Sequence, residues 1–248
     1  MAGNEDLDAG ARRPMRARSS AGEPMFRSPI FGSVPQSVTI LAGILALICV
    51  ALWLAPAAVE ETIADRFGLS PARLAAGGAG AGATGWFWAL APLVTHAFLH
   101  ATGPHLLFNL LWLFVFGTPI ARRFASPLRF FTFFALCSAA GGAFFSAFHL
   151  NDPTLLIGAS GGITGLLGGL VRFAFHRPHS KPESAKGVLP LTDKSVLIWS
   201  AVVIAMNASV AIFGPGFGAD GADIAWQAHV GGFLFGLIAF PLFDPKRR

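Results

Sequence analysis

Residues 224–243 read IAWQAHVGGFLFGLIAFPLF, an apolar run with no charged residue and a single ionisable side chain, His229. Its length matches the ~20 residues that a helix needs to cross a bilayer. Ala228, Gly232 and Gly236 recur at every fourth position of the run, and small residues at this spacing let two helices approach closely. The stretch therefore predicts a membrane-spanning helix that packs tightly on a partner and carries a polar group beside that contact.

The rest of the chain has the composition of a membrane protein. Of its 248 residues, 54% are hydrophobic and only 12% are charged, whereas a soluble domain carries about 25% charged residues. This balance excludes an ordinary soluble globule, a disordered chain and a coiled coil. The net charge of +5 does not indicate nucleic-acid binding, because the basic residues flank apolar runs. Cys49 and Cys137 lie within such runs and form no disulfide framework or metal motif.

Six apolar runs follow a polar tail of residues 1–37, which we expect to be disordered. They cover residues 38–55, 104–121, 128–149, 157–171, 195–213 and 224–243. We therefore predict an all-α membrane protein with a bundle of six transmembrane helices over residues 38–243 and a short basic tail at 244–248. With the amino terminus inside, every Lys and Arg except Arg66 and Arg73 falls on the inner side. This positive-inside pattern predicts that both termini are cytoplasmic.

Three polar side chains fall at one height in the predicted membrane. Asn109, Ser160 and His229 each lie about 20 Å above the charged residue that ends their run on the cytoplasmic side, at ~1.5 Å of rise per residue. A polar residue at membrane depth is costly and is a functional hypothesis by default. The common height predicts that the three side chains share one layer of the bundle.

The fourth run carries a second stripe of small residues, Gly161, Gly165 and Gly169, with Ser160 at its outer end. Packing this stripe on that of the last run would bring the serine hydroxyl within reach of the His229 imidazole. A serine needs such a base to become a nucleophile, and its reaction with a carbonyl needs donors for the oxyanion. Free N–H groups where the helix begins, and the side chains of His105 and Asn109, could supply them. The residues thus predict acyl transfer by a Ser–His dyad.

The same residues form three motifs that resemble those of the rhomboid family of intramembrane serine proteases. His105 and Asn109 match an HxxxN motif in the second span, and residues 158–161 (GASG) match the GxSG nucleophile motif. Residues 228–236 (AHVGGFLFG) match the AHxxGxxxG motif of the last span. Order, spacing and topology agree with the family from about residue 38 to residue 243.

The resemblance implies a serine-type endopeptidase that cleaves other membrane proteins in or near their transmembrane segments. It implies Ser160 as the nucleophile and His229 as general base and acid, with His105, Asn109 and Gly158 at the oxyanion. It implies no cofactor and no metal. The expected partners are transmembrane protein substrates and membrane lipid, with no nucleic acid. The compact layout suggests a bacterial inner (plasma) membrane.

The chain departs from the family pattern at three positions. Pro92 stands near the place of the arginine in a Trp-Arg pair of the first loop, and Ala121 replaces a glutamate that follows the second span. Thr164 occupies the position of an aromatic residue on which the family histidine often stacks. These departures concern loop anchoring, stability and the orientation of the histidine.

Other classes of membrane protein fit the sequence less well. The chief alternative is a catalytically inactive rhomboid-like protein that binds transmembrane helices in quality control, although such proteins usually lose the serine or the histidine. A zinc protease needs HExxH, which the chain lacks, although His96, His100 and His105 could hold a metal. Residues 216–220 (GFGAD) resemble the GxGD motif of aspartyl proteases only faintly. A transporter would show repeated halves and mid-membrane charges.

Overall fold

The computed structural model describes residues 34–77, 82–150, 152, 154–175, 187–213 and 224–245. The chain divides into two units, Met1–Ser33 and Val34–Arg248, and all described residues lie in the second. Most of the expected polar tail and the whole GFGAD motif lie outside the described residues. Within them every regular element is a helix, and the one isolated β-bridge pairs Leu69 with Leu156 in antiparallel fashion.

The helices, in chain order, are α1 (Gln36–Trp53), α2 (Ala57–Phe67), α3 (Pro71–Ala76), α4 (Gly82–Leu90), α5 (Pro92–Thr95), η1 (His96–Phe98), α6 (Gly103–Trp112), η2 (Leu113–Gly117), α7 (Thr118–Phe124), α8 (Pro127–Phe148), α9 (Ser160–Val171), α10 (Lys194–Phe213) and α11 (Trp226–Phe243). Among the described residues, four stretches are long and apolar enough to cross a membrane, namely α1, the continuous helix from α6 to α7, α8 and α11. The expected fourth and fifth spans correspond to α9 and α10, whose apolar helical parts are shorter.

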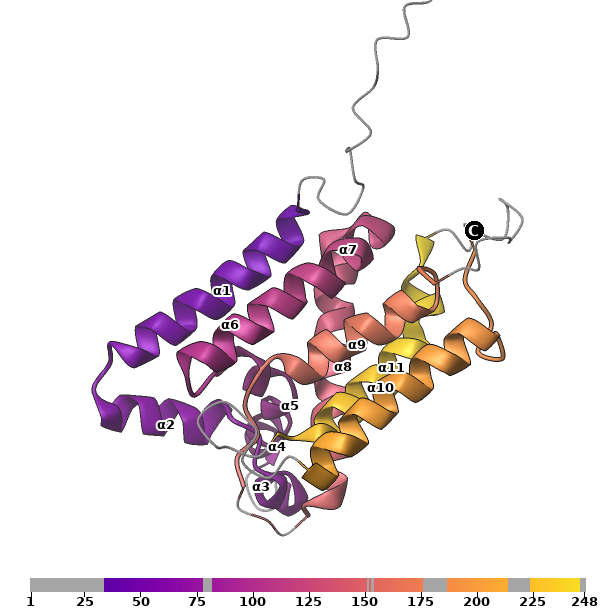
Figure 1. Cartoon of the computed structure of the whole chain (residues 1–248). Helices are drawn as coiled ribbons and strands as arrows, with labels where there is room; N and C mark the ends of the chain where they lie inside the picture. Colours follow the sequence, from indigo (N-terminus) through magenta and orange to yellow (C-terminus); the bar gives the residue numbers. More distant parts are fainter. Residues whose placement is uncertain are drawn as a thin grey trace, which may run out of the picture. The chain divides into compact units, whose positions relative to one another are not determined.

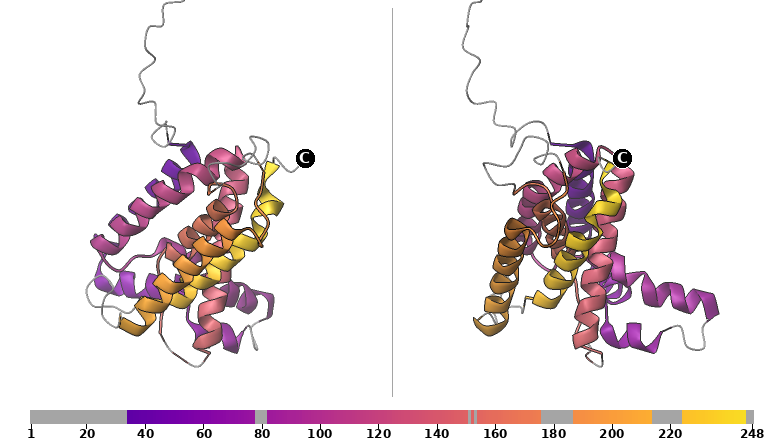
Figure 2. Two further views of the ribbon diagram at one scale, coloured as in Figure 1. Left: turned by 45° about the vertical axis from the view of Figure 1, so that its right-hand side comes forward. Right: turned by 90° about the vertical axis from the view of Figure 1, so that its right-hand side faces the viewer.

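Three helices form the centre of the bundle. The short helix α9 packs most extensively on α11 and next on α8. Helices α1 and α6 lie side by side on one side of these three helices, and α10 lies on the opposite side, next to α9 and α11 (Figures 1 and 2). The glycine stripes explain the close contact of α9 and α11. A Cβ atom built on Gly232 would overlap the Gly161 carbonyl, and one built on Gly236 would overlap the Gly165 carbonyl. The two backbones therefore meet as the sequence pattern predicts.

The helix from α6 to α7 contains a π-helical turn, η2. Pro119 lies just after this turn. Proline has no N–H to donate to the carbonyl four residues earlier, and its ring would clash with that carbonyl in a regular α-helix. The wider π turn accommodates it, since single π turns of this kind occur inside α-helices as local insertions.

The segment between α1 and α6 folds as five short helices at the end of the bundle where α9 and α11 begin. In Figure 2 helices α3 and α4 extend sideways beyond α8. The hydroxyl of Thr95 donates to the Phe67 carbonyl at 2.7 Å, and the Arg66 guanidinium lies 4.0 Å from the centre of the Trp88 ring. These contacts tie the short helices to one another.

The opposite end of α11 is held by buried charges. Arg123 on α7 forms two hydrogen bonds with Asp244, Nε to Oδ1 at 2.9 Å and Nη2 to Oδ2 at 2.6 Å, and both side chains are almost fully buried. Pro241 leaves the Leu237 carbonyl without its helical donor, and the Arg172 guanidinium donates to that carbonyl. Arginine side chains thus fasten the end of α11 to α7 and to the end of α9.

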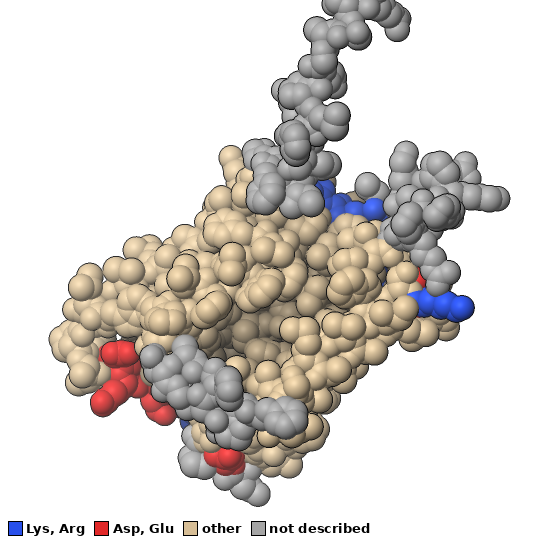
Figure 3. All heavy atoms as spheres, in the orientation of Figure 1, with Lys and Arg blue, Asp and Glu red and all other residues tan. Residues whose placement is uncertain are grey.

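Uncharged surface separates the charged side chains at the two ends of the molecule. Figure 3 shows acidic groups near one end and basic groups near the other, with a wide tan region between them. Exposed apolar side chains populate the helices that cross this region, for example Leu47, Leu107 and Ile198. A water-soluble protein would bury such a surface, whereas a lipid environment matches it.

Candidate active site

Ser160 and His229 meet where α9 and α11 begin. The His229 Nε2 atom lies 2.8 Å from the Ser160 Oγ atom, although the residues are 69 positions apart in the chain. Both side chains are half-buried. Ser160 is the first residue of α9, so the N–H groups of the first turn have no carbonyl within the helix to bind. The structure brings together the two residues from which the sequence predicts a dyad.

A third polar side chain, Asn207 on α10, completes the cluster. Its Oδ1 atom lies 3.1 Å from the His229 Nδ1 atom, and its Nδ2 atom donates to the Val203 carbonyl at 2.9 Å. Asn207 belongs to none of the three sequence motifs, and no role was predicted for it. The sequence does contain an indication of a polar role, because Asn207 is a lone amide within the apolar run 195–213.

The loop that leads into Ser160 is fastened to the first loop of the chain. Leu69 and Leu156 exchange two backbone hydrogen bonds at 3.0 and 2.9 Å, and the Gly158 N–H donates to the His96 carbonyl at 2.9 Å. Gly158 has a φ of +113°, a conformation that favours glycine. Its N–H is engaged by the His96 carbonyl, so Gly158 shapes the loop that leads into Ser160.

His96 itself anchors this part of the first loop. Burial lowers the pKa of His96 to about 4, so its ring is neutral near pH 7. The Nδ1–H of the neutral ring donates to the Pro92 carbonyl at 2.7 Å. Pro92 thereby takes part in loop anchoring through its backbone.

His105 and Asn109 lie one turn apart on α6, as the sequence predicts, but in different surroundings. A Cβ atom on Gly158 would come within 2.7 Å of the His105 Nε2 atom, so the His105 ring lies directly beside the nucleophile loop. Asn109 is buried, and its Nδ2 atom donates to the His105 carbonyl at 2.9 Å. His105 therefore lies closer to the nucleophile loop, and Asn109 supports the turn that carries it.

Thr164 makes a local contact in place of the missing aromatic residue. Its hydroxyl donates to the Ser160 carbonyl at 2.6 Å, one turn earlier on α9. The described contacts of the His229 ring nitrogens are with Ser160 and Asn207. An amide on α10, and no side chain of the segment around Thr164, makes the described contact with His229 Nδ1.

His96, His100 and His105 make separate contacts in the structure. His96 binds the Pro92 carbonyl, while His100 lies 3.4 Å from the Cys49 sulfur and packs edge-on against the His105 ring. In the described part of the chain, no group of three His, Cys, Asp or Glu side chains is arranged to hold a metal ion.

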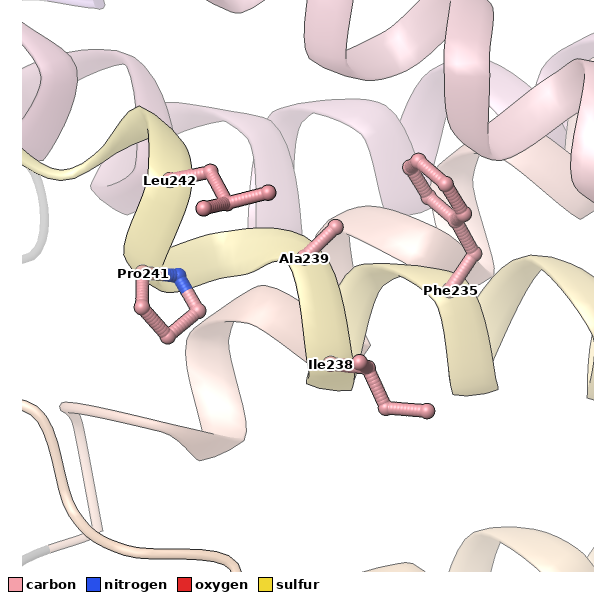
Figure 4. Close-up of a pocket in the computed structure, with 5 residues that line it drawn as sticks. All are labelled: Phe235, Ile238, Ala239, Pro241 and Leu242. Carbon is pink, nitrogen blue, oxygen red and sulfur yellow. The ribbon is translucent and has the colours of Figure 1, made fainter.

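An apolar groove lies near the other end of α11. Figure 4 shows its lining, which consists of Phe235, Ile238, Ala239, Pro241 and Leu242. Ile238 and Leu242 are strongly exposed. The lining offers no side chain capable of acid–base or nucleophilic chemistry, so the candidate site is the polar cluster of Ser160, His229 and Asn207.

Helices with lipid-facing surfaces around a Ser–His pair define a multi-pass integral membrane protein, and comparison with known proteins identifies its family. The Rhomboid domain matches residues 84–245, which is more than half of the chain. The chain is also 30% identical over 164 residues to the rhomboid protease GlpG of Serratia proteamaculans (strain 568). That alignment covers 66% of this chain and 49% of the relative, so the chain spans about half the length of this curated relative. The chain belongs to the rhomboid family, and the resemblance found in the sequence is confirmed.

Proposed function

We propose that this protein is an intramembrane serine protease that hydrolyses peptide bonds in or near transmembrane segments of other membrane proteins. The observation that carries the proposal is the 2.8 Å approach of His229 Nε2 to Ser160 Oγ. Membership of the rhomboid family and the protease named among its relatives support the same activity. The inactive alternative is not favoured, because the chain keeps both residues in hydrogen-bonding contact.

The proposed reaction divides into two acyl transfers. His229 Nε2 takes the hydroxyl proton as Ser160 Oγ bonds to the substrate carbonyl carbon, and the resulting imidazolium gives that proton to the leaving amine. Water then attacks the acyl-enzyme while His229 takes its proton, and the imidazolium returns a proton to Ser160 Oγ as the ester bond breaks and the carboxylic acid leaves. The first N–H groups of α9 and the His105 side chain are the proposed oxyanion donors, and Asn109 holds the turn that carries His105.

The site also sets a requirement on the substrate. A peptide bond within an intact helix is shielded by its own hydrogen bonds and flanking side chains. Because α9 and α11 meet through glycines, little room remains beside Ser160 for a complete helix. We therefore expect cleavage where a substrate span unwinds easily, for example at Gly or Pro.

The proposal includes a membrane arrangement. Six spans with both termini in the cytoplasm, formed by α1, α6–α7, α8, α9, α10 and α11, fit the positions of the basic residues. The bacterial relative supports a bacterial inner membrane as the proposed location. Cysteine labelling of single positions near each end of α9 and α10 would establish both the number of spans and their direction.

The test of activity is labelling and cleavage in liposomes. The parent protein should react covalently with a fluorophosphonate probe and cleave a single-span substrate, while Ser160→Ala should do neither. Ser138→Ala is the matched control, because Ser138 is buried on α8 and donates to its own helix at the Phe134 carbonyl. A parent that fails to label, or a Ser160→Ala variant that still cleaves, would remove the proposed function.

A further inference from the structure

The amide of Asn207 has a defined orientation. Its Nδ2 atom lies 2.9 Å from the Val203 carbonyl oxygen of the preceding turn, and its Oδ1 atom lies 3.1 Å from His229 Nδ1. If the amide were turned over, its oxygen would face the Val203 carbonyl, and two acceptors would oppose each other. The helix itself therefore holds the Asn207 oxygen toward the histidine.

This orientation selects one tautomer of His229. An amide oxygen accepts hydrogen bonds and cannot donate them, so Nδ1 of His229 carries the proton and donates to Asn207. Nε2 then bears the lone pair, which faces the Ser160 hydroxyl at 2.8 Å. A base that is to take the serine proton needs this arrangement, because the other tautomer would direct an N–H at the hydroxyl.

We propose that Asn207 is a positioning residue for the Ser160–His229 pair, and the inference rests on the proposed function. Its amide oxygen keeps His229 in the Nδ1–H tautomer and fixes the plane of the ring. It takes the place of the aromatic support that Thr164 does not provide. When His229 becomes an imidazolium, its Nδ1–H becomes a stronger donor, so the Asn207 oxygen stabilises the charged form more than the neutral one.

The position of Asn207 supports a role beyond helix packing. An amide within an apolar membrane helix is costly without a partner. The preceding residue, Met206, is strongly exposed, whereas Val203 is buried one turn away. Asn207 thus lies on a helix with an outward apolar face and directs its polar oxygen inward to the imidazole of His229.

The experiment measures the tautomer and the kinetics of the full chain in lipid bilayers. Nitrogen-15 NMR of histidine-labelled protein, with His229 assigned by its absence in His229→Ala, should show a protonated Nδ1 and an unprotonated Nε2. In Asn207→Leu the two tautomers should mix, and kcat should fall roughly 10-fold with KM unchanged, the loss of a charge-assisted hydrogen bond in the transition state. Asn207→Ser, whose side chain is too short to reach Nδ1, should behave in the same way if leucine impairs folding.

Two further variants separate positioning from structure. Asn207→Asp, with its carboxyl protonated, keeps a donor toward the Val203 carbonyl and an acceptor toward His229 Nδ1, and it should restore the Nδ1–H tautomer and most of kcat. Ser209→Ala removes a hydroxyl that donates to the Met206 carbonyl within the same helix. It should change neither the tautomer of His229 nor kcat. An unchanged His229 tautomer in Asn207→Leu and Asn207→Ser would overturn the inference, as would an unchanged kcat in an active enzyme.

The tautomer can be read without proteolysis, so the two proposals fail separately. A parent that shows the Nδ1–H tautomer, and loses it in Asn207→Leu, but labels with no probe and cleaves no substrate, would remove the proposed function while the Asn207 contact stands. A parent that cleaves substrate with the tautomer unaffected by Asn207 would leave the protease and remove the inference.

Discussion

Helix α11 carries a polar cluster at each end, and the two clusters differ in charge and burial. At its start His229 contacts the hydroxyl of Ser160 and the amide of Asn207, and these groups are half-buried. Beyond its end Asp244 is held by the guanidinium of Arg123, and both are almost completely buried. Oppositely charged side chains that neutralise and hydrogen-bond each other hold helices together. A half-exposed imidazole beside a hydroxyl can instead act as a base for it.

The sharpest test of this contrast is the replacement His229→Ala. Cleavage should fall by roughly 10⁴- to 10⁶-fold, because the nucleophile and its base act as one unit. The thermal midpoint should remain close to that of the parent. The double variant with Ser160→Ala should be no less active than either single variant. A large loss of stability with residual turnover would make the start of α11 a structural cluster like its end.

Breaking the other cluster should have the opposite outcome. Asp244→Ala leaves the Arg123 guanidinium buried without its carboxylate, which costs about 3–5 kcal/mol of stability. The folded fraction should retain fluorophosphonate labelling at Ser160, since that site is at the far end of α11. Thermal unfolding in detergent and the labelling rate at low temperature measure the two effects.

A double replacement sharpens the same point. Arg123→Met with Asp244→Leu removes both charges and keeps apolar volume, so stability should return to near the parental value or exceed it. If the double variant remained as unstable as Asp244→Ala, the ion pair would not be the source of the loss.

An intermediate effect on stability and labelling is expected in the middle of α11, where its glycine stripe contacts α9. Gly232→Ala forces a methyl group against the Gly161 carbonyl, which should cost about 1–3 kcal/mol and also slow labelling of Ser160. Gly43→Ala is the matched control, because nothing lies within 4 Å of its added carbon. That substitution should stabilise α1 by about 0.5–1 kcal/mol. Equal effects at the two glycines would contradict close helix contact.

The smallest effect is predicted at Thr164. Thr164→Val removes the hydrogen bond to the Ser160 carbonyl and should cost about 0.5–1.5 kcal/mol. The cleavage rate should stay within a few-fold of the parent, because the contacts of the His229 ring nitrogens are with Ser160 and Asn207. A rate loss as large as that of Asn207→Leu would assign the support of His229 to Thr164 after all.

Much of the central bundle could be predicted because it follows regular patterns. The glycines and alanine of α9 and α11 recur at fixed spacing, so the meeting of Ser160 with His229 followed from counting residues. The same counting applied to α10 would have found Asn207, whose distance from Lys194 equals that of Asn109 from Arg122. It was missed because α10 carries none of the three matched motifs, which lie on α6, at the start of α9 and on α11.

The contacts that the sequence did not predict join segments without periodicity. The Leu69–Leu156 bridge and the hydrogen bond from Gly158 to His96 connect irregular loops across long stretches of chain, and no spacing rule relates them. Arg123 was counted only as an orientation charge, since its partner Asp244 lies far along the sequence. From the sequence alone, a basic residue at a membrane boundary fits either an orientation charge or one half of an ion pair. Only the fold identifies its partner.

The π-helical turn at Leu113–Gly117 sets the direction in which side chains on either side of it point around the axis of the α6–α7 helix. A π turn holds one residue more than the α-helical turn that it replaces, and one residue turns every later side chain by about 100° around the helix axis. His105 before the turn can thus face the nucleophile loop while Arg123 after it faces Asp244. Deletion of a single residue within the turn would rotate Arg123 away from Asp244 and leave His105 in place, so this span should tolerate substitution better than any change in its length.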